Sequence, residues 1–94
     1  MNYQLSVSPQ AEEAINDTFR RYQDFGESGG IDFLSDLDDK LEMILKNPFM
    51  YQVRFGEVRT AQLKKYPYTV VYRVVAQEVQ IVNFVHASSN RKNW

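Results

Sequence analysis

Arg73 and His86 are the residues of this sequence whose surroundings first raise the question of chemistry. Both belong to the stretch YPYTVVYRVVAQEVQIVNFVH, residues 66–86, which consists of two apolar runs around a short polar break. Arg73 stands inside the first run, and His86, the single histidine, closes the second. The arginine could take part in catalysis, bind a partner or carry surface charge, and the sequence favours the last two. A histidine can transfer protons near neutral pH, but at a strand end it is more often a hydrogen-bonded structural residue.

The sequence offers no conventional catalytic or cofactor motif. With one histidine and no cysteine, a nucleophile could only be a serine, and no G-x-S-x-G turn is present. Asp36, Asp38 and Asp39 fall in a helical pattern whose spacing scatters their carboxylates around the axis, so we expect no metal site. The stretch GESGG follows a helix rather than a strand and is therefore not a phosphate loop. We expect no metal and no small-molecule cofactor.

The composition is that of one globular domain, which we expect to span residues 1–94. The absence of cysteine excludes a disulfide scaffold and fits a reducing compartment. The N-terminus MNYQLSVSPQ lacks the basic-then-apolar pattern of a secretion signal, and no run of about 18 apolar residues could span a membrane. We therefore expect a cytoplasmic protein that does not use a membrane.

Charge is divided unevenly along the chain. Residues 1–47 contain four basic and ten acidic residues, whereas residues 48–94 contain seven basic and two acidic residues. This division indicates either an anionic partner for the second half or two solvated faces of opposite sign. The formal net charge of −1 argues against a strong non-specific nucleic-acid binder.

Hydrophobic periodicity predicts a strand followed by two helices. Tyr3, Leu5 and Val7 alternate with polar residues, as in a half-buried strand. Ser8 and Pro9 are a helix start, GESGG ends that helix, and Asn47-Pro48 ends the next one. Each helix carries one apolar stripe. The stripe residues are Ala11, Ala14, Ile15, Phe19, Tyr22 and Phe25 in the first helix, and Phe33, Leu34, Leu37, Leu41, Ile44 and Leu45 in the second.

After Pro48 the pattern changes to strands. Residues 53–63 read as one strand with a bulge at Gly56, and residues 68–75 and 79–85 read as a hairpin. The order β-α-α-β-β-β predicts an α+β fold in which a helical hairpin packs on one face of a mainly antiparallel sheet. The opposite face then stays accessible, and strand alternation places Arg73 on it.

The stretch VRTAQLKKYPYTVVYRV and a C-terminal segment running from a histidine to a tryptophan resemble the RelE/ParE superfamily of type II toxin–antitoxin toxins, most of all its ParE-like branch. His86 and Trp94 stand at the spacing typical of that branch, although Ser89-Asn90-Arg91 replaces its Arg-Asp-Pro. The residues that match the core motif are Val58, Arg59, Leu63, Lys64, Lys65, Tyr66, Pro67, Tyr68, Tyr72, Arg73 and Val74.

This resemblance implies the toxin component of a type II toxin–antitoxin module, which inhibits growth through DNA gyrase and forms a hetero-oligomer with a cognate antitoxin. In that function the chain is not an enzyme. The resemblance also implies that Arg59 and Arg73 lie on the exposed sheet face. The implied target- or antitoxin-contact residues are Arg59, Tyr68, Arg73, Arg91, Lys92 and Trp94, with core packing as the alternative for Tyr68.

Two other functions stay open at this stage. A RelE-like, ribosome-dependent mRNA endoribonuclease would use Glu57 or His86 as acid or base, with Arg59, Arg73 and Arg91 as clamps on the phosphate. Such ribonucleases usually carry an arginine where this chain has Tyr68 and are more basic overall. The third alternative is a decayed toxin that only binds its antitoxin, as the missing Arg-Asp-Pro suggests.

Overall fold

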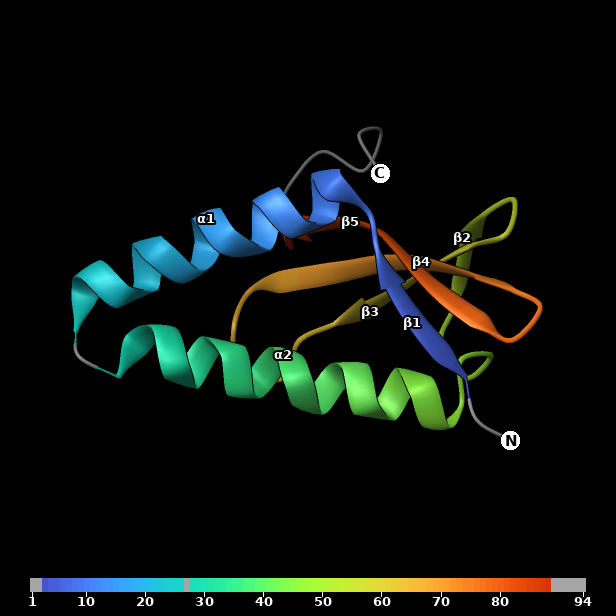
Figure 1. Cartoon of the computed structure of the whole chain (residues 1–94), viewed down its shortest axis with the longest axis horizontal. Coiled ribbons are helices and arrows are strands. Elements are labelled where there is room, and N and C mark those ends of the chain that lie inside the picture. Colours follow the sequence, from blue (N-terminus) through green and yellow to red (C-terminus); the bar gives the residue numbers. More distant parts are fainter. Residues whose placement is uncertain (1–2, 27, 89–94) are drawn as a thin grey trace.

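The structure is a computed structural model that describes residues 3–26 and 28–88. Within these ranges the chain forms a strand, two helices and then four strands (Figure 1). The elements are β1 (Gln4–Val7), α1 (Pro9–Phe25), α2 (Gly29–Lys46), β2 (Val53–Phe55), β3 (Val58–Gln62), β4 (Tyr68–Val75) and β5 (Glu78–His86).

The strands form one sheet in the order β1-β5-β4-β3-β2. β1 pairs with β5 in parallel, and the remaining neighbours pair antiparallel. The two helices run in opposite directions along one face of this sheet (Figure 1). Phe33, Leu37 and Ile44 of α2 and Ala11 of α1 meet the inward side chains of β3, β4 and β5 in a single core cluster. The predicted α+β fold is confirmed.

The start of α1 is fixed to the sheet by Ser8. Its Oγ accepts a hydrogen bond from the backbone N–H of Ala11 at 3.1 Å, which is the helix cap that the sequence predicts. The same hydroxyl donates to the backbone carbonyl of Val82 at 3.1 Å. Val82 is the extra residue of a bulge in β5, since Val71 pairs with Asn83 and Tyr72 with Ile81. The helix therefore begins at a defined point of the sheet.

The turn between the helices depends on close packing at Gly30. A Cβ built on Gly30 would lie 2.7 Å from Cε1 of Phe19, so only glycine lets the helices approach this closely. Phe25, which the sequence assigns to the apolar stripe of α1, is 86% exposed. That prediction is wrong because Phe25 is the last residue of α1, at the tip of the hairpin where the core no longer reaches.

The stretch 53–63, predicted as one bulged strand, is a hairpin of β2 and β3. Gly56 adopts a φ of +52° in the turn at Gly56 and Glu57, a left-handed conformation that glycine accepts without strain. The chain therefore reverses at Gly56 instead of bulging, and the sheet gains a strand. No helix within residues 3–26 and 28–88 has the length and apolar character needed to cross a membrane.

Candidate functional site

Arg59 lies on the face of the sheet that the helices cover. It stands opposite Tyr72 across β3 and β4, and side chains directly opposite each other share a face. The prediction that Arg59 belongs to the exposed face is wrong, because the register places it against Tyr72 rather than Arg73, and one residue of register decides the face. Its Nη1 donates to the backbone carbonyls of Tyr51 at 2.6 Å and Phe49 at 3.3 Å.

Arg59 and Tyr72 together anchor the connection between α2 and β2. The guanidinium of Arg59 also lies 5.2 Å from the ring centroid of Phe49. Tyr72 is fully buried, and its hydroxyl donates to the carbonyl oxygen of Pro48 at 2.6 Å. Burial raises the pKa of Tyr72 to about 12. These two residues of the family motif thus hold residues 48–51 against the sheet.

Tyr68 is a core residue. It is 7% exposed, and its ring stacks on Phe84 with centroids 5.2 Å apart and meets Phe33 edge-on at 6.1 Å. The packing interpretation of Tyr68 is confirmed. Its contact with a partner stays a prediction, which this burial does not favour.

Arg73 lies on the face away from the helices, as predicted. It is exposed, and its Nε donates to Oε1 of Gln80 at 2.7 Å. Gln80 in turn donates to Oε1 of Glu78 at 2.6 Å, so Arg73, Gln80 and Glu78 form a hydrogen-bonded series on the surface. The other predicted contact residues, Arg91, Lys92 and Trp94, lie outside the described residues.

Glu57 and His86 stand at opposite ends of the sheet. Glu57 is in the turn between β2 and β3, beside the end of β4 that carries Arg73, whereas His86 pairs with Tyr68 at the other end. This separation is roughly 15–20 Å along β4 at about 3.3 Å per residue. Nδ1 of His86 accepts from the backbone N–H of Ser88 at 3.1 Å. The structure therefore does not bring the two weak catalytic candidates together.

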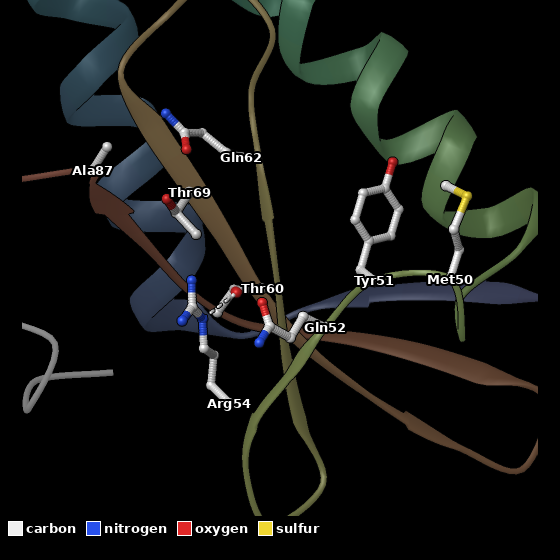
Figure 2. Close-up of a pocket in the computed structure, with 8 residues that line it drawn as sticks. All are labelled: Met50, Tyr51, Gln52, Arg54, Thr60, Gln62, Thr69 and Ala87. Carbon is white, nitrogen blue, oxygen red and sulfur yellow. Dashed lines mark hydrogen bonds between the residues drawn. The ribbon is translucent and has the colours of Figure 1, made fainter.

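A pocket of about 340 Å³ that the sequence did not reveal opens on the face away from the helices (Figure 2). Thr60 and Gln62 of β3 and Thr69 of β4 line it, since Gln62 pairs with Thr69 and Thr60 with Val71. Arg54 of β2 reaches over this surface, and its Nε donates to Oγ1 of Thr60 at 3.1 Å. Met50, Tyr51, Gln52 and Ala87 complete the lining (Figure 2).

The described residues of the pocket do not suggest acid–base chemistry. They supply one guanidinium, hydroxyls and carboxamides, and none of them is a histidine or a carboxylate. Thr60 and Thr69 are 8% and 5% exposed, so their hydroxyls lie at the bottom of the site. Within the residues that the structure describes, no three histidine, cysteine, aspartate or glutamate side chains gather where they could hold a metal ion.

Residues 49–55 carry four exposed apolar side chains. Phe49, Met50, Val53 and Phe55 are 42–56% exposed. Large apolar side chains that gather on a surface mark sites of protein–protein contact. Phe49 and Val53 line a separate hollow together with Arg59, whereas Met50 and Arg54 line the pocket of Figure 2.

Asp36 is a further residue whose role the sequence did not indicate. Its carboxylate is buried and accepts hydrogen bonds from the backbone N–H groups of Lys65 at 2.8 Å and Tyr66 at 3.0 Å. It therefore fixes the loop between β3 and β4 onto α2. This loop carries the Tyr-Pro-Tyr part of the motif, so the contact positions β4.

Solved structures with the same architecture come from toxin–antitoxin systems. A chain described as belonging to the chromosomal ParDE system from P. aeruginosa has a TM-score of 0.79 at 17% identity, covering 92% of this chain and 97% of that one. The isolated E. coli RelE toxin has a TM-score of 0.61 at 18% identity, covering 97% and 90%. A chain of the intact E. coli RelBE toxin–antitoxin complex has a TM-score of 0.61 at 18% identity, covering 93% and 99%. Identities this low show a shared fold, the RelE/ParE-like fold.

The sequence comparison is more specific about the family. No curated protein gives a significant match. The family model described as the ParE toxin of the type II toxin–antitoxin system, parDE, matches residues 5–91, nearly the whole chain. The resemblance drawn from the VRTAQLKKYPYTVVYRV motif is thereby confirmed, and the chain belongs to the ParE toxin family of type II toxin–antitoxin systems.

Proposed function

We propose that this ParE-family toxin inhibits growth by acting on DNA gyrase and is neutralised by direct binding of a cognate antitoxin. Gyrase is the target that the resemblance to the ParE-like branch implies. Two of the similar structures are described as a ParDE system and an intact RelBE toxin–antitoxin complex, which supports a hetero-oligomer here as well.

The observation that carries this proposal is the dispersal of the groups that RNA cleavage would need. Cleavage requires a base, an acid and cations within hydrogen-bond reach of one phosphate. Glu57 and His86 stand at opposite ends of the sheet, and Arg59 is engaged on the helix side by backbone carbonyls. Among the described residues that line the pocket of Figure 2, one is a cation and none is an acid or a base. This arrangement favours a toxin that acts by binding over a RelE-like ribonuclease.

Arg73 is the described residue that we propose as a target contact. It is exposed on the face away from the helices and held by Gln80 in a fixed orientation. Arg91, Lys92 and Trp94 stay predicted contacts. The acidic residues of the chain are concentrated in α1 and α2, on the opposite side of the sheet, so a negatively charged target would approach the face that carries Arg73.

Purified toxin added to gyrase and supercoiled plasmid should lead to accumulation of cleaved DNA. Arg73→Ala should weaken this effect. Arg20→Ala is a matched control, because it removes the same charge from an exposed position on α1, where Arg20 forms a weak ion pair with Asp17 at 3.7 Å. If folded wild-type protein leaves supercoiling unaffected, the gyrase proposal is wrong.

Binding of the antitoxin is tested separately. Co-expression with the neighbouring reading frame should yield a co-purifying complex with a dissociation constant in the low nanomolar range or below, corresponding to about −12 kcal/mol. Expression of the toxin alone should arrest growth, and co-expression should restore it. If expression alone leaves growth unchanged while the complex still forms, the chain is a protein that only binds its antitoxin.

A further inference from the structure

A hollow of about 520 Å³ lies between α2 and the loop that joins β3 to β4. Its described lining combines lysines, carboxylates and a methionine. These residues are Asp36, Asp39, Lys40 and Met43 of α2 and Lys64 and Lys65 of the loop. We refer to this site as the lysine hollow. It is distinct from the pocket of Figure 2, because the described linings of the two sites share no residue.

The loop that carries Lys64 and Lys65 is held in place at two points. Just before the lysines, the backbone N–H of Leu63 donates to the carbonyl of Tyr68 at 2.9 Å. The buried carboxylate of Asp36 accepts from the backbone N–H of Lys65 at 2.8 Å. The lysine side chains therefore start from fixed positions, and a preformed site of this kind loses less conformational entropy when a ligand binds.

The charges of the lysine hollow are not balanced internally. Lys64 and Lys65 are exposed, and their side chains make no hydrogen bond or ion pair within residues 3–26 and 28–88. Nζ of Lys40 donates to the hydroxyl of Tyr51 at 3.4 Å, which is a neutral partner. Among the described lining residues, three ammonium groups stand beside two carboxylates, and Asp36 already accepts backbone N–H groups. One positive charge is left over, so the hollow suits a ligand with one carboxylate.

Met43 gives the lysine hollow an apolar part. Its side chain is 45% exposed, and a methionine adapts its shape readily to an apolar neighbour. Lysine side chains also carry an apolar methylene chain below their charge. A small free anion would leave Met43 in water, whereas an acidic residue with an apolar residue beside it would cover both parts of the site. The ligand that fits is therefore a piece of polypeptide.

A nucleic acid fits this surface less well. α2 contains five acidic and two basic residues, and Asp38, Asp39 and Glu42 are exposed. Every phosphate of a nucleic acid carries a negative charge, so a chain leaving the hollow along α2 would meet these carboxylates. A protein segment can place one acidic side chain on the lysines and remain neutral elsewhere.

We propose that the lysine hollow binds a glutamate or aspartate of a protein partner together with the apolar side chain beside it. Lys64 and Lys65 donate to the carboxylate, and Met43 packs against the apolar side chain. This inference goes beyond the proposed action on gyrase. The surface is formed by α2 and the loop before β4, rather than by the sheet face that carries Arg73.

The site is tested by NMR on the full-length protein with isotope-labelled methionine methyl groups. The probes are acetyl-Leu-Glu-Leu-amide, acetyl-Leu-Gln-Leu-amide, acetyl-Ser-Glu-Ser-amide and thymidylyl-thymidine. The first probe should shift the signal of Met43 saturably, leave that of Met50 in place, and bind at least about threefold more tightly than the other three. Equal affinity for the glutamine or the serine peptide, tighter binding of the dinucleotide, or no saturable shift of Met43 would each overturn the proposal.

Replacing both loop lysines provides a second, independent test. Lys64→Gln combined with Lys65→Gln should weaken binding of the first peptide at least about threefold. The midpoint of urea unfolding should stay unchanged, because the backbone bond to Asp36 remains. Arg21→Gln combined with Lys46→Gln is the control, since it removes the same charge from exposed positions outside the hollow and should leave affinity unchanged.

Equal weakening by the two double variants would mean that only net charge matters, and the proposal would be wrong. No gyrase is present in these titrations. A peptide that binds as expected beside an inactive gyrase assay would therefore refute the gyrase function alone, and a peptide that fails to bind would refute the lysine hollow alone.

Discussion

Replacing Tyr72 by phenylalanine tests the anchoring of the connection between α2 and β2. Tyr72 is fully buried, and its hydroxyl donates to the carbonyl oxygen of Pro48 at 2.6 Å. The substitution keeps the aromatic ring, so core packing and strand propensity change little. The difference in free energy of unfolding between the two proteins then measures the loss of this hydrogen bond and the cost of leaving the carbonyl oxygen of Pro48 without a donor.

The structure allows the magnitude to be worked out. A net intramolecular hydrogen bond contributes about 0.5–1.5 kcal/mol, and a buried acceptor left without a donor costs about 1–3 kcal/mol. Pro48 is itself fully buried, so water cannot easily replace the lost hydroxyl. We therefore expect Tyr72→Phe to lower the free energy of unfolding at pH 7 by about 1–3 kcal/mol.

The same hydroxyl makes the wild-type protein sensitive to alkaline pH. Burial raises the pKa of Tyr72 from 10.0 to about 12, so the folded state keeps its proton after the unfolded state has lost it. The corresponding stability is complete below pH 10 and is lost as the pH rises through 12, by up to about 3 kcal/mol. The advantage of the wild type over Tyr72→Phe should shrink over this range. Burial also raises the pKa of Tyr22, so some alkaline loss persists in the variant.

Urea unfolding followed by circular dichroism at pH 7 and pH 11 measures both effects. Tyr3→Phe is the control, because Tyr3 is half-buried and its hydroxyl makes no hydrogen bond within the described residues, and it should change stability by about 0.5 kcal/mol or less. A Tyr72→Phe variant as stable as the wild type at pH 7 would refute the hydrogen-bond argument. An unchanged difference between the two pH values would refute the pKa argument.

Three further substitutions test how the helices are held. Asp36→Ala removes the acceptor of two backbone amides at 2.8 and 3.0 Å, and chemical denaturation should show a loss of about 2–4 kcal/mol; a loss below about 1 kcal/mol would contradict the role of this carboxylate. Ser8→Ala removes a helix cap and should cost about 1 kcal/mol by the same measurement, whereas Ser28→Ala, at a helix start without a side-chain cap, should cost less. Gly30→Ala should lower the free energy of unfolding by about 1–2 kcal/mol, because its methyl group would crowd Phe19 of α1, and the thermal midpoint should fall. Gly26→Ala has open space around it and should leave the midpoint unchanged. Equal midpoints for the two variants would contradict the close approach of the helices at Gly30.

Much of the fold could be predicted because its determinants are local. The cap at Ser8, the apolar stripes of the helices and the alternation along β4 each depend on residues close together in sequence. The hairpin at Gly56 was missed because Gly-Glu is not among the strong dipeptide signals for a two-residue turn. The bulge at Val82 was missed as well, because it reflects how β5 meets β4 and α1.

The site was less predictable because its geometry depends on register and on distant parts of the chain. Arg59 and Arg73 look alike in the motif, but the pairing of Arg59 with Tyr72 sends their side chains to opposite faces. Residues 50–52, 54, 60, 62, 69 and 87 meet only in the folded protein, so no local sequence pattern predicts the pocket. Thr69 reads in sequence as an ordinary strand residue, and only its burial at the pocket distinguishes it in the structure.

The parallel pairing of β1 with β5 has a consequence for how the toxin is made. Gln4 pairs with Glu78, and Ser8 bonds to Val82 across 74 positions of sequence. β1 therefore cannot pair with β5 until almost the whole polypeptide has left the ribosome. At about 5–20 residues per second, this delay is roughly 4–15 seconds of translation. The sheet of a nascent chain therefore stays incomplete, without its β1–β5 pairing, until the last strand has emerged.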